Sequence, residues 1–231
     1  MQKQKINIHY LIIQSNYTGI EIALCSQEKI LKKICIDKKN SSKNLIPDIE
    51  NILKNNELEI DQISFIGVNQ GPGPFTTLRV AITTSNALNF ALKIPLVSIN
   101  GLEIFLQENK SKKYHTTVAI LNAFNNDVYF GILLDTESLE IGCKNIDLFL
   151  KELQTRFIDQ KIQFIGSGIN FFESNIKDIL KDNFYIPEPL PLGPSLEALA
   201  KTSYSKWLSK QDITQQIIPL YLKDAIIKKE V

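Results

Sequence analysis

The stretch Gly71-Pro72-Gly73-Pro74-Phe75-Thr76-Thr77-Leu78-Arg79 decides how the first half of the chain folds. Two glycines and two prolines in a row interrupt any helix or strand, because proline lacks a backbone donor and glycine favours turns. The short apolar run at residues 63–68 before it predicts a buried strand. The sequence therefore predicts a strand, a tight loop, and a helix capped by Thr76 or Thr77 that runs to about Leu92.

The same loop carries the clearest functional signal in the sequence. Glycines let the backbone approach a ligand, and the start of a helix offers unpaired N–H groups to an anion such as phosphate. The two prolines oppose this interpretation, since they have no N–H to donate. The sequence is compatible with two interpretations, a tight strand-to-helix turn and a phosphate-binding loop. The phosphate-binding loop would use Gly71, Gly73 and Thr76.

The helix after the loop is apolar almost all round. One side consists of small residues, Val80, Thr84, Ala87 and Ala91. Only a narrow polar stripe remains, formed by Arg79, Thr83, Asn86 and Lys93. Such a helix is usually buried on more than one side. Its second side contacts either a partner chain or another lobe of the same chain.

Working outward, both halves of the chain show a sheet followed by helices. In the first half, residues 6–13, 18–25 and 28–36 predict an antiparallel meander, and Leu45, Ile49 and Ile52 mark the apolar face of a helix. In the second half, strands are predicted at 117–121, 128–134, 139–143 and 162–165, and helices at 146–157, 171–180 and 195–209. We expect two α/β lobes, 1–100 and 101–231.

Composition and motifs exclude several classes of protein. The 26 basic and 25 acidic residues leave a net charge of +1, which argues against autonomous binding of tRNA or DNA. Three scattered cysteines and no apolar run long enough for a signal peptide or a membrane span predict a cytoplasmic protein. The two histidines are not spaced as metal ligands, and no HExxH, P-loop or GxSxG motif occurs, so neither a metal site nor a catalytic residue is predicted.

The loop and its helix resemble the GPGSFTGLRIG signature of the TsaB (YeaZ) family. The resemblance continues along the chain in Ile94-Pro95-Leu96-Val97, Leu121-Asn122-Ala123 before Val128-Tyr129, Gly166-Ser167-Gly168 and Pro219-Leu220-Tyr221-Leu222-Lys223. It implies a two-lobed actin-like α/β fold (ASKHA, with sugar kinases and actin), each lobe a mixed sheet flanked by helices.

The resemblance also implies a function. Members are non-catalytic scaffold or dimerisation subunits that bind TsaD, which transfers threonylcarbamoyl from threonylcarbamoyl-adenylate to N6 of the adenosine beside the anticodon of tRNAs. The chain alone is then expected to bind no cofactor, because the complex uses ATP and a metal held by TsaD. TsaE is a further expected partner, tRNA is contacted only through the complex, and a homodimer in isolation is an alternative.

The family docks through two helices of the first lobe, which correspond here to residues 43–55 and 76–92. The interface residues implied are Leu45, Ile49, Ile52, Thr76, Val80, Thr84, Ala87 and Ala91. The family also usually opens with I-D-T-S, where this chain has Ile13-Gln14-Ser15-Asn16. Because an amide cannot replace the charge of the aspartate, the resemblance implies only a degenerate phosphate site: Gln14, Ser15, Gly71, Gly73 and Thr76.

Two other functions are alternatives to the scaffold. One is a glycoprotease-like peptidase, for which the sequence supplies no nucleophile–base pair and no zinc motif. The other is a stand-alone actin-like nucleotide-binding protein, against which Gln14 argues. Thr77 stands where the family usually has glycine, which leaves less room for a ligand at the start of the helix.

Overall fold

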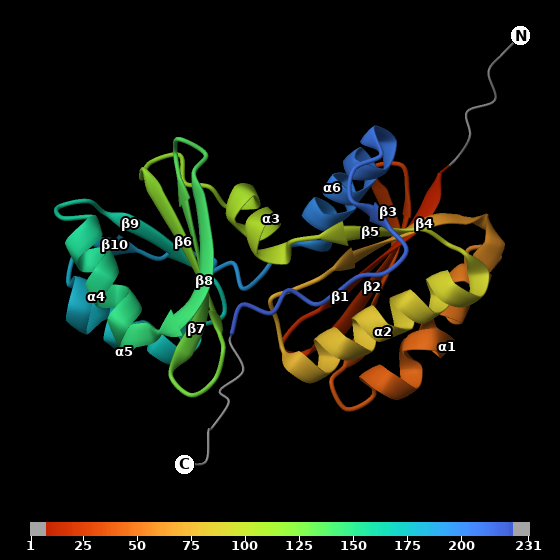
Figure 1. Cartoon of the computed structure of the whole chain (residues 1–231), viewed down its shortest axis with the longest axis horizontal. Helices are drawn as coiled ribbons and strands as arrows, with labels where there is room; N and C mark the ends of the chain where they lie inside the picture. Colours follow the sequence, from red (N-terminus) through yellow and green to blue (C-terminus); the bar gives the residue numbers. More distant parts are fainter. Residues whose placement is uncertain (1–7, 224–231) are drawn as a thin grey trace, which may run out of the picture. The chain divides into compact units, whose positions relative to one another are not determined.

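The computed structural model describes residues 8–223, which divide into two compact units (Figure 1). Unit 1 comprises the described residues up to Ile104 together with Ser195–Leu220. Unit 2 comprises Phe105–Pro194 and the described residues after Leu220. The first division lies inside α3 (Gly101–Glu108), close to the predicted boundary at 100. The prediction that all of 101–231 forms the second lobe is wrong, because the chain returns to unit 1 after residue 194.

Unit 1 is built on a six-stranded sheet of order β11-β5-β4-β1-β2-β3. Its elements up to residue 99 are β1 (His9–Ser15), β2 (Gly19–Ser26), β3 (Lys29–Asp37), α1 (Ser41–Lys54), the 3-10 turn η1 (Ile60–Gln62), β4 (Ile63–Asn69), α2 (Phe75–Leu92) and β5 (Leu96–Ile99). Its returning segment adds α6 (Leu196–Ser209) and β11 (Ile213–Thr214). β1 runs antiparallel to β2 and parallel to β4, as a meander followed by a helical crossover requires.

Alternate residues of β1 serve the two faces of this sheet. Leu11 and Ile13 point into the core that α1 and α2 cover. Tyr10 and Ile12 point to the opposite core, which α6 covers (Figure 1). There the Tyr10 and Phe65 rings stack with centroids 4.4 Å apart, and Phe65 stacks on Trp207 of α6 at 4.8 Å. At β1 both faces of the sheet are therefore buried, which explains the near-continuous apolar sequence of this strand.

Unit 2 repeats the strand order of unit 1. Its elements are β6 (Thr116–Asn122), β7 (Asp127–Leu134), β8 (Leu139–Asn145), α4 (Ile146–Arg156), β9 (Ile162–Ile165), α5 (Ile169–Leu180) and β10 (Phe184–Tyr185). The sheet order β10-β9-β6-β7-β8 corresponds strand for strand to β5-β4-β1-β2-β3. α4 and α5 share one core with this sheet, in which Phe130 and Phe149 stack at 4.4 Å.

The structure confirms the predicted fold class of two α/β units, each with a mixed sheet and flanking helices. The sequence missed α3 and the two short strands β10 and β11. The first predicted strand began at residue 6, which lies outside the described residues, and β1 begins at His9. Within residues 8–223, no helix combines the length and apolarity needed to cross a membrane.

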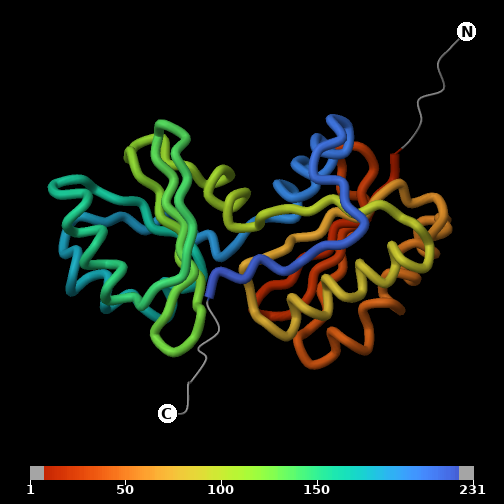
Figure 2. Tube along the Cα trace, viewed as in Figure 1, coloured from red at the N-terminus to blue at the C-terminus, as the bar shows by residue number. Residues whose placement is uncertain are grey.

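The predicted extended tail lies along unit 1 up to Leu220. We call residues 212–220 the strap. Figure 2 shows it in blue beside α2, and Ile217, at its centre, is buried in the core under α2. The strap therefore covers part of the helix that the sequence left open on its second side.

Candidate functional site

The carboxyl end of β1, where the family carries its aspartate, is occupied by an internal amide network. Gln14 is 3% exposed, and its Nε2 donates to Oε2 of Glu21 at 2.7 Å. Its Oε1 accepts from Nδ2 of Asn69 at 3.4 Å. Cys35 donates its thiol to the same Glu21 at 3.7 Å, and burial together with that carboxylate raises the pKa of Cys35. The polar groups at this strand end are engaged with one another.

The loop after β4 is held by short hydrogen bonds to its neighbours. Oδ1 of Asn69 accepts from the N–H of Gly71 at 2.9 Å. Gly71 has φ +102°, a left-handed conformation that glycine adopts at no steric cost. A side chain at Gly73 would meet only the carbonyl of Ser15, at 3.9 Å. The structure thus brings Gln14, Ser15, Gly71 and Gly73 to one end of the unit 1 sheet.

Thr76 and Thr77 take different places from those predicted. α2 begins at Phe75 with Pro74 as its N-cap, so neither threonine caps the helix. Thr76 is exposed, whereas Thr77 is 1% exposed and shares a 2.7 Å hydrogen bond with the hydroxyl of Ser15. The side chain of Thr77 therefore fills the space between the start of α2 and the end of β1. The hydroxyl of Ser15 is therefore bonded to the buried Thr77 and does not face the solvent.

The described residues contain no group of three histidine, cysteine, aspartate or glutamate side chains that could hold a metal ion. His9 is half-buried at the start of β1. His115 pairs with Asp135 at 2.5 Å on the surface of unit 2, and this hydrogen bond lowers the pKa of the Asp135 carboxyl. Within unit 1, His9 begins β1, whereas Gln14 and Ser15 end it.

The glycine turn of unit 2 is shaped by its own sheet. Gly166 has φ +107°, and a Cβ there would lie 2.3 Å from the carbonyl oxygen of Ile120. Gly168 donates its N–H to the same carbonyl at 2.9 Å. These two glycines let the turn pass directly over β6. Ser167, between them, is buried with no hydrogen-bond partner for its hydroxyl in the described residues.

α2 presents one continuous exposed face, which we call the α2 face. Its members follow one another at steps of three or four residues, with one adjacent pair at the end: Thr76, Arg79, Thr83, Ala87, Phe90 and Ala91. Phe90, near the end of α2, is 79% exposed. Phe75, the first residue of α2, is 55% exposed, and Arg79 stacks over its ring at 3.7 Å. Three of the predicted interface residues, Thr76, Ala87 and Ala91, lie on this face. Val80 and Thr84 are half-buried at its margin.

The prediction that residues of α1 form part of the partner interface is wrong. Leu45, Ile49 and Ile52 are between 0 and 3% exposed and belong to the core of unit 1. A partner cannot reach them, because the apolar stripe of an amphipathic helix faces its own core. The apolar residue that α1 does expose is Ile46, at 48%. Sequence reasoning missed Ile46, Phe75 and Phe90, although each interrupts the inward pattern of its helix.

The correction on α1 yields a prediction for stability. Leu45→Ala is expected to lower the free energy of unfolding by about 3 kcal/mol, through lost burial and the cavity left behind. Ile46→Ala, one position along the same helix, should change it by less than about 1 kcal/mol, since the side chain is largely exposed. Urea unfolding followed by the fluorescence of Trp207, which lies in unit 1, measures both. Equal losses would mean that α1 is oriented differently.

Comparison with known proteins agrees with this architecture. The family described as TsaD, tRNA N6-adenosine threonylcarbamoyltransferase, matches residues 35–226. The protein "tRNA threonylcarbamoyladenosine biosynthesis protein TsaB" of Buchnera aphidicola subsp. Acyrthosiphon pisum is 27% identical over 196 residues, 80% of this chain and 86% of that protein. The protein of the same description from Bacillus subtilis is 27% identical over 192 residues, 80% of this chain and 82% of its own length.

A solved structure shows the same fold over nearly the whole chain. A Pseudomonas aeruginosa protein, described as similar to peptidase YeaZ, superimposes with a TM-score of 0.70 at 18% identity. The match covers 94% of this chain and 100% of that one. At this identity the likeness concerns the fold, and the family follows from the sequence matches. The chain belongs to the family of TsaD, the tRNA N6-adenosine threonylcarbamoyltransferases, as a member of its TsaB (YeaZ) group.

Proposed function

We propose that this chain serves in tRNA threonylcarbamoyladenosine biosynthesis as a non-catalytic subunit that binds TsaD through the α2 face. In this proposal TsaD transfers the threonylcarbamoyl group to N6 of the adenosine beside the anticodon. ATP and the metal belong to the rest of the complex, in which TsaE takes part. tRNA reaches this chain only through that complex, and the cytoplasm is the proposed compartment.

The exposed α2 face is the observation that carries the proposal. A soluble protein seldom leaves a phenylalanine as exposed as Phe90 beside further apolar side chains unless the surface is used. The small side chains of Ala87 and Ala91 allow the backbone of a partner helix to come close. Phenylalanine and arginine, both present at the exposed side of α2, are among the residue types enriched at protein–protein interfaces.

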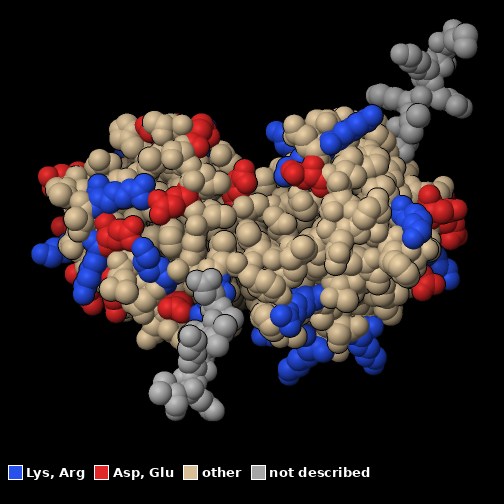
Figure 3. Space-filling model, viewed as in Figure 1, with Lys and Arg blue, Asp and Glu red and all other residues tan. Residues whose placement is uncertain are grey.

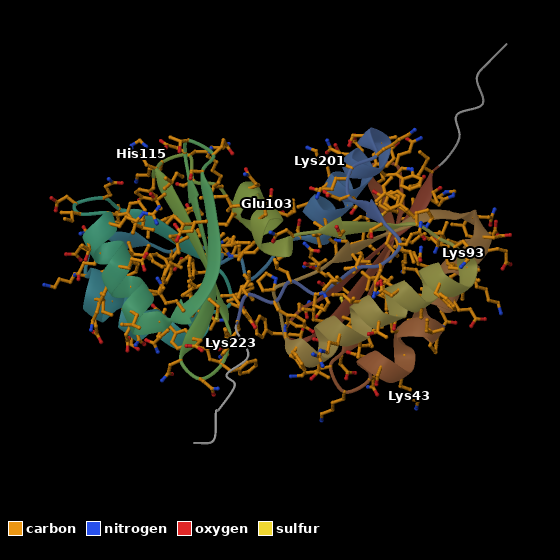
Figure 4. The ribbon with its side chains drawn as sticks, viewed as in Figure 1. Lys43, Lys93, Glu103, His115, Lys201 and Lys223 are labelled. Carbon is orange, nitrogen blue, oxygen red and sulfur yellow. The ribbon has the colours of Figure 1, made fainter. Side chains whose placement is uncertain are left out.

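The charges around α2 indicate what kind of surface it accepts. α2 itself contains no acidic residue, and its charged groups, with the residue that follows it, are Arg79 and Lys93. Figure 3 shows the surface over α2 as largely uncharged, and Figure 4 places Lys93 at the end of α2 and Lys43 near the start of α1. An apolar partner surface with acidic side chains at its margin fits such a face.

The buried network at the carboxyl end of β1 supports the non-catalytic part of the proposal. Gln14 supplies an amide where a metal–phosphate site needs a carboxylate, and this amide is bound to Glu21 and Asn69. Thr77 and Ser15 bond to each other and take up the space at the start of α2. A nucleotide phosphate placed at this strand end would have to displace these bonds.

The deciding experiment mixes the full chain with TsaD from the same organism and measures mass by size-exclusion chromatography with light scattering. We expect a stable co-eluting complex, and no transfer of threonylcarbamoyl to tRNA by this chain alone. Separate peaks with ATP, TsaE and tRNA present would contradict the partner role. Transfer by the isolated chain, or micromolar binding of Mg²⁺–ATP to it in calorimetry, would contradict the non-catalytic role.

A further inference from the structure

The strap is fastened to unit 1 along its whole length. Asp212 forms an ion pair with Lys206 at 2.6 Å and accepts from the N–H of Ser98 through its carbonyl. β11 then pairs with β5. Farther on, Nδ2 of Asn89 donates to the side chain of Gln215 at 3.2 Å, and the N–H of Leu220 donates to the carbonyl of Gln70 at 2.8 Å. The strap thus runs antiparallel to α2, from its last turns to the loop before it (Figure 2).

Asn86 makes the central contact between α2 and the strap. Its Nδ2 donates to the carbonyl of Ile217 at 3.0 Å, and its Oδ1 accepts from the N–H of the same residue at 2.9 Å. A single amide therefore satisfies both backbone groups of Ile217, as a neighbouring strand would do. The side chain of Ile217 is 2% exposed and that of Ile218, the next residue, is 69% exposed. The contact fixes one isoleucine in the core and the next on the surface.

Ile218 is held beside the α2 face. Thr83 lies three residues before Asn86, and Phe90 four residues after it, so all three share one side of the helix. One exposed isoleucine has little meaning by itself. This one is fixed by a paired backbone contact next to a helix side that exposes Phe90.

We propose that Ile218 is part of the docking surface together with Phe90, Ala87 and Ala91, and that Asn86 is the positioning residue that holds it there. The inference rests on the function proposed above. The partner surface is then wide enough to contact both α2 and the strap. It is apolar opposite Ile218 and Phe90 and acidic at its margin, opposite Arg79 and Lys93.

The test is a double-mutant cycle on the full chain, with affinity for TsaD of the same organism as the measurement. Ile218→Ala should raise the dissociation constant about tenfold, the effect typical of a contributing apolar contact. Asn86→Ala should raise it at least as much. The double variant should be no weaker than Asn86→Ala, because Asn86 acts through Ile218. Asn170→Ala, at an exposed position of α5, is the matched control and should bind as the unchanged protein does.

A second measurement distinguishes a loss of strap positioning from a general loss of folded structure. Amide exchange at Ile217 should accelerate in Asn86→Ala, whereas Trp207 fluorescence and circular dichroism should stay unchanged. Normal affinity of Ile218→Ala, or effects of the two substitutions that multiply in the double variant, would overturn the inference while leaving docking by α2 intact. Failure of the unchanged chain to bind TsaD would reject the proposed function and this inference with it.

Discussion

Ala87→Glu is expected to abolish the complex with TsaD, raising the dissociation constant at least about a hundredfold, because a carboxylate would be buried unpaired in an apolar interface. Ala91→Glu, one turn along the α2 face, should act in the same way. The fold should survive both changes, since both positions are exposed and glutamate is a good helix former. Titration with TsaD measures the loss, and circular dichroism checks the fold.

Ser205→Glu is the matched control for this pair. It adds the same charge to an exposed position of a helix, but on α6, which covers the opposite face of the unit 1 sheet. Its affinity for TsaD should equal that of the unchanged chain. Full affinity of Ala87→Glu would show that the partner binds elsewhere, and unfolding of Ala87→Glu would show that the helix side is internal.

Gly166→Ala is expected to lower the stability of unit 2 by about 3–5 kcal/mol, the sum of a strained backbone and an overpacked contact. The added Cβ would lie 2.3 Å from the backbone carbonyl oxygen of Ile120. No side-chain rotation can relieve this clash, because the backbone of residue 166 fixes the position of its Cβ. φ at this position is +107°, which residues with a side chain rarely adopt. The turn would have to lift off β6 and break the bond from Gly168.

The single tryptophan makes the location of this loss measurable. Trp207 lies in unit 1, so its fluorescence reports unit 1, whereas circular dichroism reports both units. In Gly166→Ala the dichroism transition in urea should move to lower concentration while the Trp207 transition stays. Gly193→Ala is the control, because a Cβ there meets no atom within 4 Å, and it should leave both transitions in place. An unchanged dichroism transition in Gly166→Ala would contradict the close approach to β6.

The spacing of apolar residues predicted most helices and strands, because the local sequence of each element agrees with the structure that it adopts. The alternation in β2 identifies a strand and its apolar side, and the spacing of four and then three residues between Leu45, Ile49 and Ile52 does the same for α1. The discontinuous unit 1 was not predictable in this way. The apolar pattern of residues 196–209 predicts a helix, but it does not indicate which sheet the helix packs against. In the structure that sheet is formed mainly by the first hundred residues.

The candidate site shows the same division between local and distant information. The loop at Gly71 and the missing aspartate at Gln14 are readable from neighbouring residues. The sequence predicts that Asn86 belongs to the polar stripe of its helix. In the structure its side chain binds the backbone of Ile217, 131 positions away. The error on α1 had a different cause, since an apolar stripe was assigned to a partner when a helix buries that stripe in its own core.

The return of the chain to unit 1 fixes an order of events during synthesis on the ribosome. Residues 8–104 emerge first, but one face of their sheet stays uncovered until α6, near the end of the chain, has been made. The intervening segment Phe105–Pro194 takes roughly 5 to 20 s to translate at the usual rate. During that interval Tyr10 and Phe65 face water or a chaperone. The nascent chain therefore completes most of its second unit before its first.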